Sequence, residues 1–186
     1  TIPTKGSKTG SMVFLFGSCS AAVNSFAIDA SGSVVVAGAQ DGSLAVWKIS
    51  DGKKVGAISG AHEGGVRAVT FLSPTCVVSA GADGTVRIWH VSGDPRLRML
   101  HRMAAGDSPL TAIAAWAQEG VAHQFLAAGA DDGTVYAWKA KAPVNMDGEM
   151  RCEPTTVSHH LQGKEVVELS FRGDGAALIA GACDER

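Results

Sequence analysis

The sequence lacks several features on which large classes of protein depend. No apolar run approaches the roughly 20 residues that a membrane-spanning helix requires, and the longest candidate, residues 12–16, has only the length of a strand. The 186 residues include 16 basic and 18 acidic side chains, so the basic excess needed for non-specific nucleic-acid binding is missing. Residues 1–5 show no apolar core of a signal peptide. These absences argue against a membrane-spanning chain and against nucleic-acid binding as the main activity.

Cysteine is scarce, and the spacing of the cysteines does not indicate a metal site. The four cysteines lie far apart, and no two of them show the spacing of metal ligands. This usage favours a reducing, intracellular compartment, with the cytoplasm expected first and the nucleus, cilium or cytoskeleton left open, although spacing alone leaves a disulfide possible. The cysteines are Cys19, Cys76, Cys152 and Cys183.

Glycine, by contrast, is abundant. The chain has 23 glycines among 186 residues but only 6 prolines, and the glycines follow no collagen period. Glycine spread at this density predicts many tight turns between short strands and excludes long helices. The 46% of hydrophobic residues are enough for a core, which rules out disorder of the whole chain.

One pattern occurs three times along the chain. Each copy has an Asp-Gly pair between two apolar runs, which is a strong signal for a β-hairpin, and each copy ends in a tryptophan: Trp47, Trp89 and Trp138. Another alternating run precedes each hairpin and a rougher one follows it. The pattern therefore predicts units of four strands, and these span residues 23–59, 66–103 and 110–156.

Four antiparallel strands repeated every ~40–45 residues form one blade of a propeller, and on these three copies the chain resembles the WD-repeat family of β-propellers. The resemblance implies an all-β fold of four-stranded antiparallel blades, either a partial ring or a fragment of a ring that usually has seven blades. It assigns residues 1–10 to a loop or linker and residues 11–186 to the propeller. Within the propeller, residues 11–17 are expected to form an outer strand and residues 166–182 the first two strands of a last blade.

Three complete blades with partial blades at both ends leave the ring open. Either the sequence is a piece of a longer chain, or another subunit completes the ring. The stop inside a hairpin turn and the missing initiating Met favour the first explanation. A compact four-bladed ring is a third, strained arrangement.

The middle unit carries the residues of the family's structural hydrogen-bond tetrad. His62 is expected to open the first strand, Ser79 lies on the second, Asp83 in the following turn, and Trp89 ends the third. The resemblance implies a relay from the Trp89 indole through Ser79 and His62 to Asp83, which gives a buried indole its partner. A nucleophilic triad is the disfavoured interpretation, because Ser79 lies within a strand. The other units have small residues at the serine and histidine positions, namely Ala37 and Cys19 in the first and Ala128 and Gly106 in the third.

The resemblance implies a non-catalytic scaffold for protein–protein interaction, a subunit of a multiprotein intracellular complex whose partners are other proteins. No catalytic residue, cofactor, metal or small-molecule substrate is expected. Two sets of loops, those between the fourth and first strands and those between the second and third, share one rim of such a fold, and binding residues are expected there. The candidates are Asn24, Gln40, Glu63, Arg67, Thr111 and Asp131.

A basic strip lies on the predicted outer strand of the middle unit. Arg96, Arg98 and Arg102 fall on one face of an uninterrupted strand. Such charge either protects an edge strand from pairing with another chain or forms a docking strip for an acidic partner or RNA. An RNA-contacting module is therefore the alternative function, and a propeller enzyme is a third, less favoured one.

Overall fold

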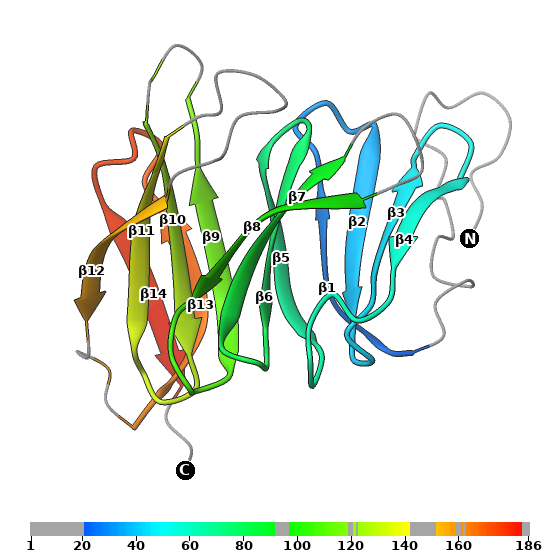
Figure 1. Cartoon of the computed structure of the whole chain (residues 1–186). Coiled ribbons are helices and arrows are strands. Elements are labelled where there is room, and N and C mark those ends of the chain that lie inside the picture. Colours follow the sequence, from blue (N-terminus) through cyan, green and yellow to red (C-terminus); the bar gives the residue numbers. More distant parts are fainter. Residues whose placement is uncertain are drawn as a thin grey trace, which may run out of the picture.

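In the computed structural model, the chain consists of antiparallel β-sheets joined by tight turns (Figure 1). The structure describes residues 21–91, 97–118, 121, 123–141, 152–158, 161 and 163–183. The predicted loop at 1–10, the predicted strand at 11–17, Cys19 and Arg96 lie outside these residues. Within the described part of the chain there is no helix that is long and apolar enough to cross a membrane.

The strands form three four-stranded antiparallel sheets and one hairpin, which we call blades 1 to 4. Blade 1 contains β1 (Val23–Ile28), β2 (Val34–Ala39), β3 (Leu44–Lys48) and β4 (Lys54–Ile58). Blade 2 contains β5 (Val66–Ser73), β6 (Cys76–Gly81), β7 (Thr85–Val91) and β8 (Leu97–Ala104). Blade 3 contains β9 (Leu110–Trp116), β10 (His123–Ala130), β11 (Val135–Lys141) and β12 (Cys152–Ser158). Blade 4 contains β13 (Glu165–Phe171) and β14 (Leu178–Cys183).

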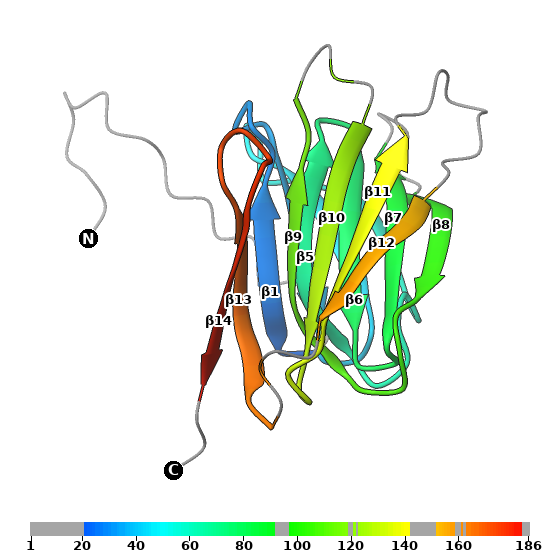
Figure 2. The ribbon, with the colours of Figure 1, turned by 90° about the vertical axis from the view of Figure 1, so that its left-hand side faces the viewer.

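The blades stand side by side in chain order, and their first strands lie innermost. β1 contacts β5, β5 contacts β9, and β9 contacts β13. Figure 2 shows the inner strands β5 and β9 on one side of the molecule and the outer strands β8 and β12 on the other. The described sheets form an open arc, and the all-β propeller architecture expected from the sequence is confirmed.

The core lies between neighbouring blades rather than inside a single layer. A blade between two others is covered on both faces, which explains why β6 of blade 2 is buried along its whole length instead of alternating. Each described tryptophan of the repeat points away from the following blade. Trp89 packs with Val36 and Leu44 of blade 1, and Trp138 packs with Ile88 of blade 2.

Two large apolar side chains remain exposed on the outer face of blade 1. Phe26 is 58% exposed and Ile28 is 52% exposed, on the same face of the sheet as Trp47. On the outer face of blade 4, Ile179 is 64% exposed. Apolar surface of this kind is typical of a position where another element packs.

The Asp-Gly turns explain how the blades are joined. In each turn the aspartate accepts a hydrogen bond from the backbone two residues later, at 3.0 Å for Asp41, 3.2 Å for Asp83 and 2.8 Å for Asp132. The glycine that follows has a positive φ, which favours glycine over any residue with a side chain. A Cβ at Gly84 would lie 2.1 Å from the carbonyl oxygen of Gly106, so the missing side chain also lets the incoming loop of the next blade cross the turn.

Candidate functional site

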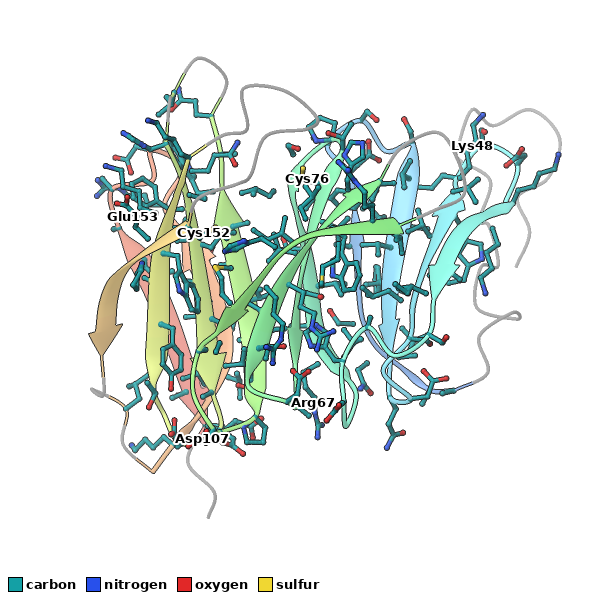
Figure 3. All side chains as sticks on the ribbon, viewed as in Figure 1. Lys48, Arg67, Cys76, Asp107, Cys152 and Glu153 are labelled. Atoms are coloured by element: carbon teal, nitrogen blue, oxygen red, sulfur yellow. The ribbon has the colours of Figure 1, made fainter. Side chains whose placement is uncertain are left out.

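One edge of the sheets gathers the connections that enter each blade and the turns between the second and third strands. We call this edge the loop rim; it is the lower edge in Figure 1. Arg67 and Asp107 both lie there in Figure 3. Of the six predicted binding residues, Gln40, Glu63 and Asp131 lie in these loops, and the other three lie near the start of an inner strand.

Three of the predicted residues occupy the same position in successive blades. Asn24, Arg67 and Thr111 are each the second residue of an inner strand, and each is the extra residue of a β-bulge. A bulge turns a side chain away from the regular alternation of the strand. The Asn24 amide nitrogen donates to the Val66 carbonyl at 2.9 Å, and the Thr111 hydroxyl donates to the Val166 carbonyl at 2.6 Å. Asn24 therefore binds blade 1 to blade 2, and Thr111 binds blade 3 to blade 4.

Arg67 has the same position but a different role. Its side chain is exposed, and it makes no hydrogen bond or ion pair with another described residue. It lines a cavity of about 360 Å³ at the junction of three blades, a volume within the range of small-ligand pockets, roughly 300–1,000 Å³. We call this the rim cavity. Its lining comes from blade 2 and from the entries and turns of blades 3 and 4: Arg67, Pro109, Thr111, Asp131, Gly163 and Glu165.

The rim cavity is polar and carries charges of both signs. Arg67 contributes a guanidinium group, while Asp131 and Glu165 contribute carboxylates. The side chains of Asp131 and Glu165 are exposed and, like that of Arg67, are not engaged by other described residues. These three groups are thus available to a partner molecule.

The two remaining predicted rim residues lie outside the rim cavity. Gln40 is exposed in the β2–β3 turn, where its backbone nitrogen donates to the Ala22 carbonyl at 2.8 Å. Glu63 is exposed in the loop before β5, and its backbone nitrogen donates to the Asp83 carboxylate at 3.3 Å. The structure therefore brings together Arg67, Thr111 and Asp131 around one cavity, but not Asn24, Gln40 and Glu63.

The structure places the four tetrad residues in one continuous hydrogen-bonded chain. The Trp89 indole nitrogen donates to the Ser79 hydroxyl at 2.8 Å, and the same hydroxyl lies 2.7 Å from Nε2 of His62. Nδ1 of His62 lies 2.9 Å from the Asp83 carboxylate. Every group in this series has a hydrogen-bond partner when the Ser79 hydroxyl donates to Nε2 and the Nδ1–H of a neutral His62 donates to the Asp83 carboxylate. Since His62 and Ser79 are buried, this series of hydrogen bonds stabilises the blade and is inaccessible to a substrate.

The predicted place of His62 in the chain is wrong. β5 begins at Val66, so His62 lies in the loop before the strand and does not open it. Gly64 and Gly65, with φ of 73° and 111°, lie between His62 and the start of β5. A backbone in that region cannot continue a strand, and the loop instead turns the imidazole back toward Ser79.

Burial and hydrogen bonding shift the two titratable groups of the tetrad. Burial lowers the pKa of His62, and the neighbouring Asp83 only partly offsets this. Burial raises the pKa of Asp83, but hydrogen bonds from Thr85 and His62 outweigh it and hold that pKa below 3.8. The fold therefore favours a neutral imidazole beside an ionised carboxylate.

In blade 3, a tyrosine that the sequence analysis did not single out packs against the repeat tryptophan. Tyr136 stacks on Trp138, with ring centroids 6.0 Å apart and planes inclined by 21°. A Cβ at Gly106, which holds the histidine position, would lie 2.3 Å from the Tyr136 hydroxyl, so the phenol fills the space of the absent imidazole. The signal for this role was a tyrosine two residues before Trp138 in a blade that lacks both serine and histidine.

The prediction that the arginines of β8 share a face is wrong. A β-bulge interrupts the pairing of β8 with β7, because successive residues Ile88 and Trp89 oppose His101 and Met99. Arg102 pairs with Arg87, whereas Arg98 pairs with His90, so the two arginines point to opposite faces of blade 2. Accordingly, Leu97 packs toward blade 1 and Met103 toward blade 3.

The thiols and potential metal ligands of the described residues show no reactive arrangement. Cys76 and Cys152 are free thiols, and burial raises the pKa of Cys152 to about 11. Among the residues that the structure places, no group of three or more His, Cys, Asp or Glu side chains could hold a metal ion.

Part of the chain matches a known family of repeats. Residues 10–48 and 52–90 match the family described as WD domain, G-beta repeat. The chain is 26% identical over 167 residues to periodic tryptophan protein 2 homolog of Mus musculus, covering 83% of this chain and 17% of that protein. It is 40% identical over 63 residues to ribosome biogenesis protein ytm1 of Aspergillus oryzae, covering 32% of this chain and 13% of that protein. The chain thus spans less than a fifth of the length of these relatives.

A solved structure with a similar fold is that of the computationally designed Ika4 protein. The two chains superpose with a TM-score of 0.69 at 27% identity, and the match covers 93% of this chain and 92% of the designed one.

Proposed function

Because the chain belongs to the WD-repeat family of β-propellers, we propose that it is a non-catalytic scaffold that holds a protein partner at its loop rim within an intracellular multiprotein complex. The rim cavity is the observation that carries this proposal. It places one guanidinium and two carboxylates, all without partners among the described residues, at the junction of three blades.

The rim is suited to recognition because its side chains stand on rigid supports. The Thr111–Val166 and Asn24–Val66 hydrogen bonds fix neighbouring inner strands to one another. Strands held in this way lose little backbone freedom when a partner binds. Charges of both signs in one cavity favour a partner with complementary charges, which gives specificity and a faster association rate.

The names of the relatives suggest which partners to test first. One relative is called a ribosome biogenesis protein, so proteins that assemble ribosomes are the first candidates for the partner of this chain. RNA binding through the predicted arginine strip has less support, because Arg98 and Arg102 point to opposite faces of blade 2.

Charge reversal in the rim cavity tests the proposal. We expect R67E and D131K each to weaken partner binding by about tenfold or more, as is typical when one side of a charged contact is removed. Proteins captured from cell extract by the wild-type chain would be quantified by mass spectrometry. The partner found would then be purified, and its affinity for each variant measured by calorimetry.

A matched control lies at the opposite edge of the sheets. Lys53, in the β3–β4 turn, is exposed, and K53E should leave the affinity unchanged. Equal binding by R67E, D131K and the wild type would refute the rim as the docking surface.

A further inference from the structure

The charged groups of the rim cavity are sorted by sign across it. Arg67 belongs to β5 of blade 2, whereas Asp131 lies in the β10–β11 turn of blade 3 and Glu165 begins β13 of blade 4. Figure 3 shows Arg67 at the loop rim, beneath blade 2. The cavity therefore has a positive side on blade 2 and a negative side on blades 3 and 4.

Two hydrogen bonds place both carboxylate-bearing residues beside the start of β9. The Asp131 backbone nitrogen donates to the Pro109 carbonyl at 3.1 Å, and the Thr111 hydroxyl donates to the Val166 carbonyl at 2.6 Å. Since Glu165 directly precedes Val166, the two acidic residues adjoin the same short segment, residues 109–111. A cationic group that enters this side of the cavity is attracted by both carboxylates.

The rest of the lining offers little else that is polar. The Thr111 hydroxyl is already used in its bond to blade 4. Pro109 supplies apolar surface, and at Gly163 no atom lies within 4 Å of the position of a Cβ, so this wall is open. Lys164 has an interaction of its own and does not line the cavity. The lining therefore combines three charges with space and apolar surface for the alkyl stem of a long basic side chain.

We propose that the rim cavity recognises a segment of the partner protein in which one basic and one acidic side chain point to the same side. The lysine or arginine lies near Asp131 and Glu165, and the aspartate or glutamate binds Arg67. In an extended segment, residues i and i+2 point to the same side, so one residue separates the recognised pair. This inference rests on the proposed function, because it names the chemistry of the segment that the scaffold holds.

The balance of charge in the cavity disfavours partners with charges of one sign. An RNA backbone carries a negative charge at each phosphate, so Arg67 attracts it while Asp131 and Glu165 repel it. A purely basic segment satisfies the two carboxylates but brings like charge toward Arg67. A mixed pair satisfies all three groups.

Tripeptides test this charge order by NMR titration of the isotope-labelled protein. N-acetyl-Lys-Ala-Asp-amide should give saturable shifts at the backbone amides of Thr111, Asp131 and Gly163. The peptides Gln-Ala-Asp and Lys-Ala-Asn, with the same end groups, each lack one charge and should bind about threefold or more weakly, as is typical of exposed ion pairs. R67Q should abolish the effect of removing the acid from the peptide. The double variant D131N/E165Q should abolish the effect of removing the base.

Two variants outside the cavity serve as matched controls. Glu168 is exposed on β13 of blade 4, and Lys53 is exposed at the opposite edge of the sheets; neither lines the rim cavity. E168Q and K53Q should keep both preferences of the wild type, because they remove a carboxylate and a cation without changing the cavity.

Equal affinity of the three tripeptides, or no saturable shifts with any of them, would overturn the inference. Tighter binding of N-acetyl-Lys-Ala-Lys-amide or of oligouridylate would overturn it as well, because neither carries the mixed pair. The proposed function fails in a different measurement, if R67E and D131K hold the purified partner as tightly as the wild type does. Partner binding that depends on the rim, together with equal binding of the tripeptides, would refute the charge order alone.

Discussion

The indole nitrogen of Trp89 donates a hydrogen bond to the hydroxyl of Ser79 at 2.8 Å, across the strands β7 and β6 of the middle blade. Both side chains are buried, Trp89 at 1% exposure and Ser79 at 0%. The hydroxyl also bonds His62, so this pair connects the core between blades 1 and 2 to the turn that carries Asp83. In blade 3, where alanine and glycine hold the serine and histidine positions, Trp138 stacks on Tyr136 instead.

Removal of Trp89 should therefore destabilise the protein strongly. We expect Trp89→Ala to lower the free energy of unfolding by ~3–5 kcal/mol, because it leaves a cavity and an unpaired hydroxyl. Ser79→Ala keeps the volume of the core and should cost only ~1–3 kcal/mol. Urea denaturation measures both values. A loss below ~1 kcal/mol in Trp89→Ala would contradict a stabilising role for the tetrad.

The tetrad should also make stability depend on pH. The pKa of His62 is lower in the folded protein than its usual value of 6.5, so the unfolded chain binds the proton first as the pH falls. The stabilisation is fully present above pH 6.5 and is lost as the pH falls through the folded pKa. The pKa of Asp83 is also lowered, so the contribution of Asp83 to the free energy of unfolding is likewise lost as the pH falls below 3.8.

Denaturation midpoints measured between pH 7 and 4, about the span of these two groups, would show the effect. His62→Gln should flatten the dependence on pH below 6.5. His101→Gln, on β8 of the same blade, serves as the control and should leave the dependence in place. A variant of His62 with an unchanged profile would count against this origin of the acid sensitivity.

Glycines of the second strands set how closely the blades approach. A Cβ at Gly129 would lie 2.3 Å from a methyl group of Val166 in the next blade. We expect Gly129→Ala to lower the free energy of unfolding by ~1–3 kcal/mol through overpacking. At Gly173 no atom lies within 4 Å of such a Cβ, so Gly173→Ala should change stability little. Comparable midpoints for the two variants in urea would refute this packing argument.

The third blade offers a test of coupling between Gly106 and Tyr136. A Cβ at Gly106 would meet the Tyr136 hydroxyl at 2.3 Å and the ring carbon that bears it at 3.2 Å. Gly106→Ala should therefore be destabilising, and Tyr136→Phe should relieve part of the clash. In a double-mutant cycle, we expect the combined loss to be smaller than the sum of the single losses by ~0.5 kcal/mol or more. Additive losses would show that the hydroxyl does not occupy this space.

Much of the architecture could be predicted because its signals are local. An Asp-Gly pair between two apolar runs determines a hairpin by itself, since the glycine adopts the positive φ and the aspartate caps the turn. Three such hairpins, each ending in a tryptophan, are enough to predict successive four-stranded units. The tetrad was recognisable through the resemblance to the WD-repeat family, because the aspartate and the tryptophan recur in each unit while His62 and Ser79 stand at the matching positions of the middle unit.

Other features depend on contacts between blades or on breaks in strand alternation. The bulge in β8 separates Arg98 from Arg102, and no local pattern marks an unpaired residue in a strand. The rim cavity forms where β5 of blade 2 meets the entries and turns of blades 3 and 4. The sequence alone determined the repeating unit, since hydrogen bonds within a hairpin connect near neighbours. Tertiary structure alone decided which side chains meet in a cavity, since those residues come from different blades.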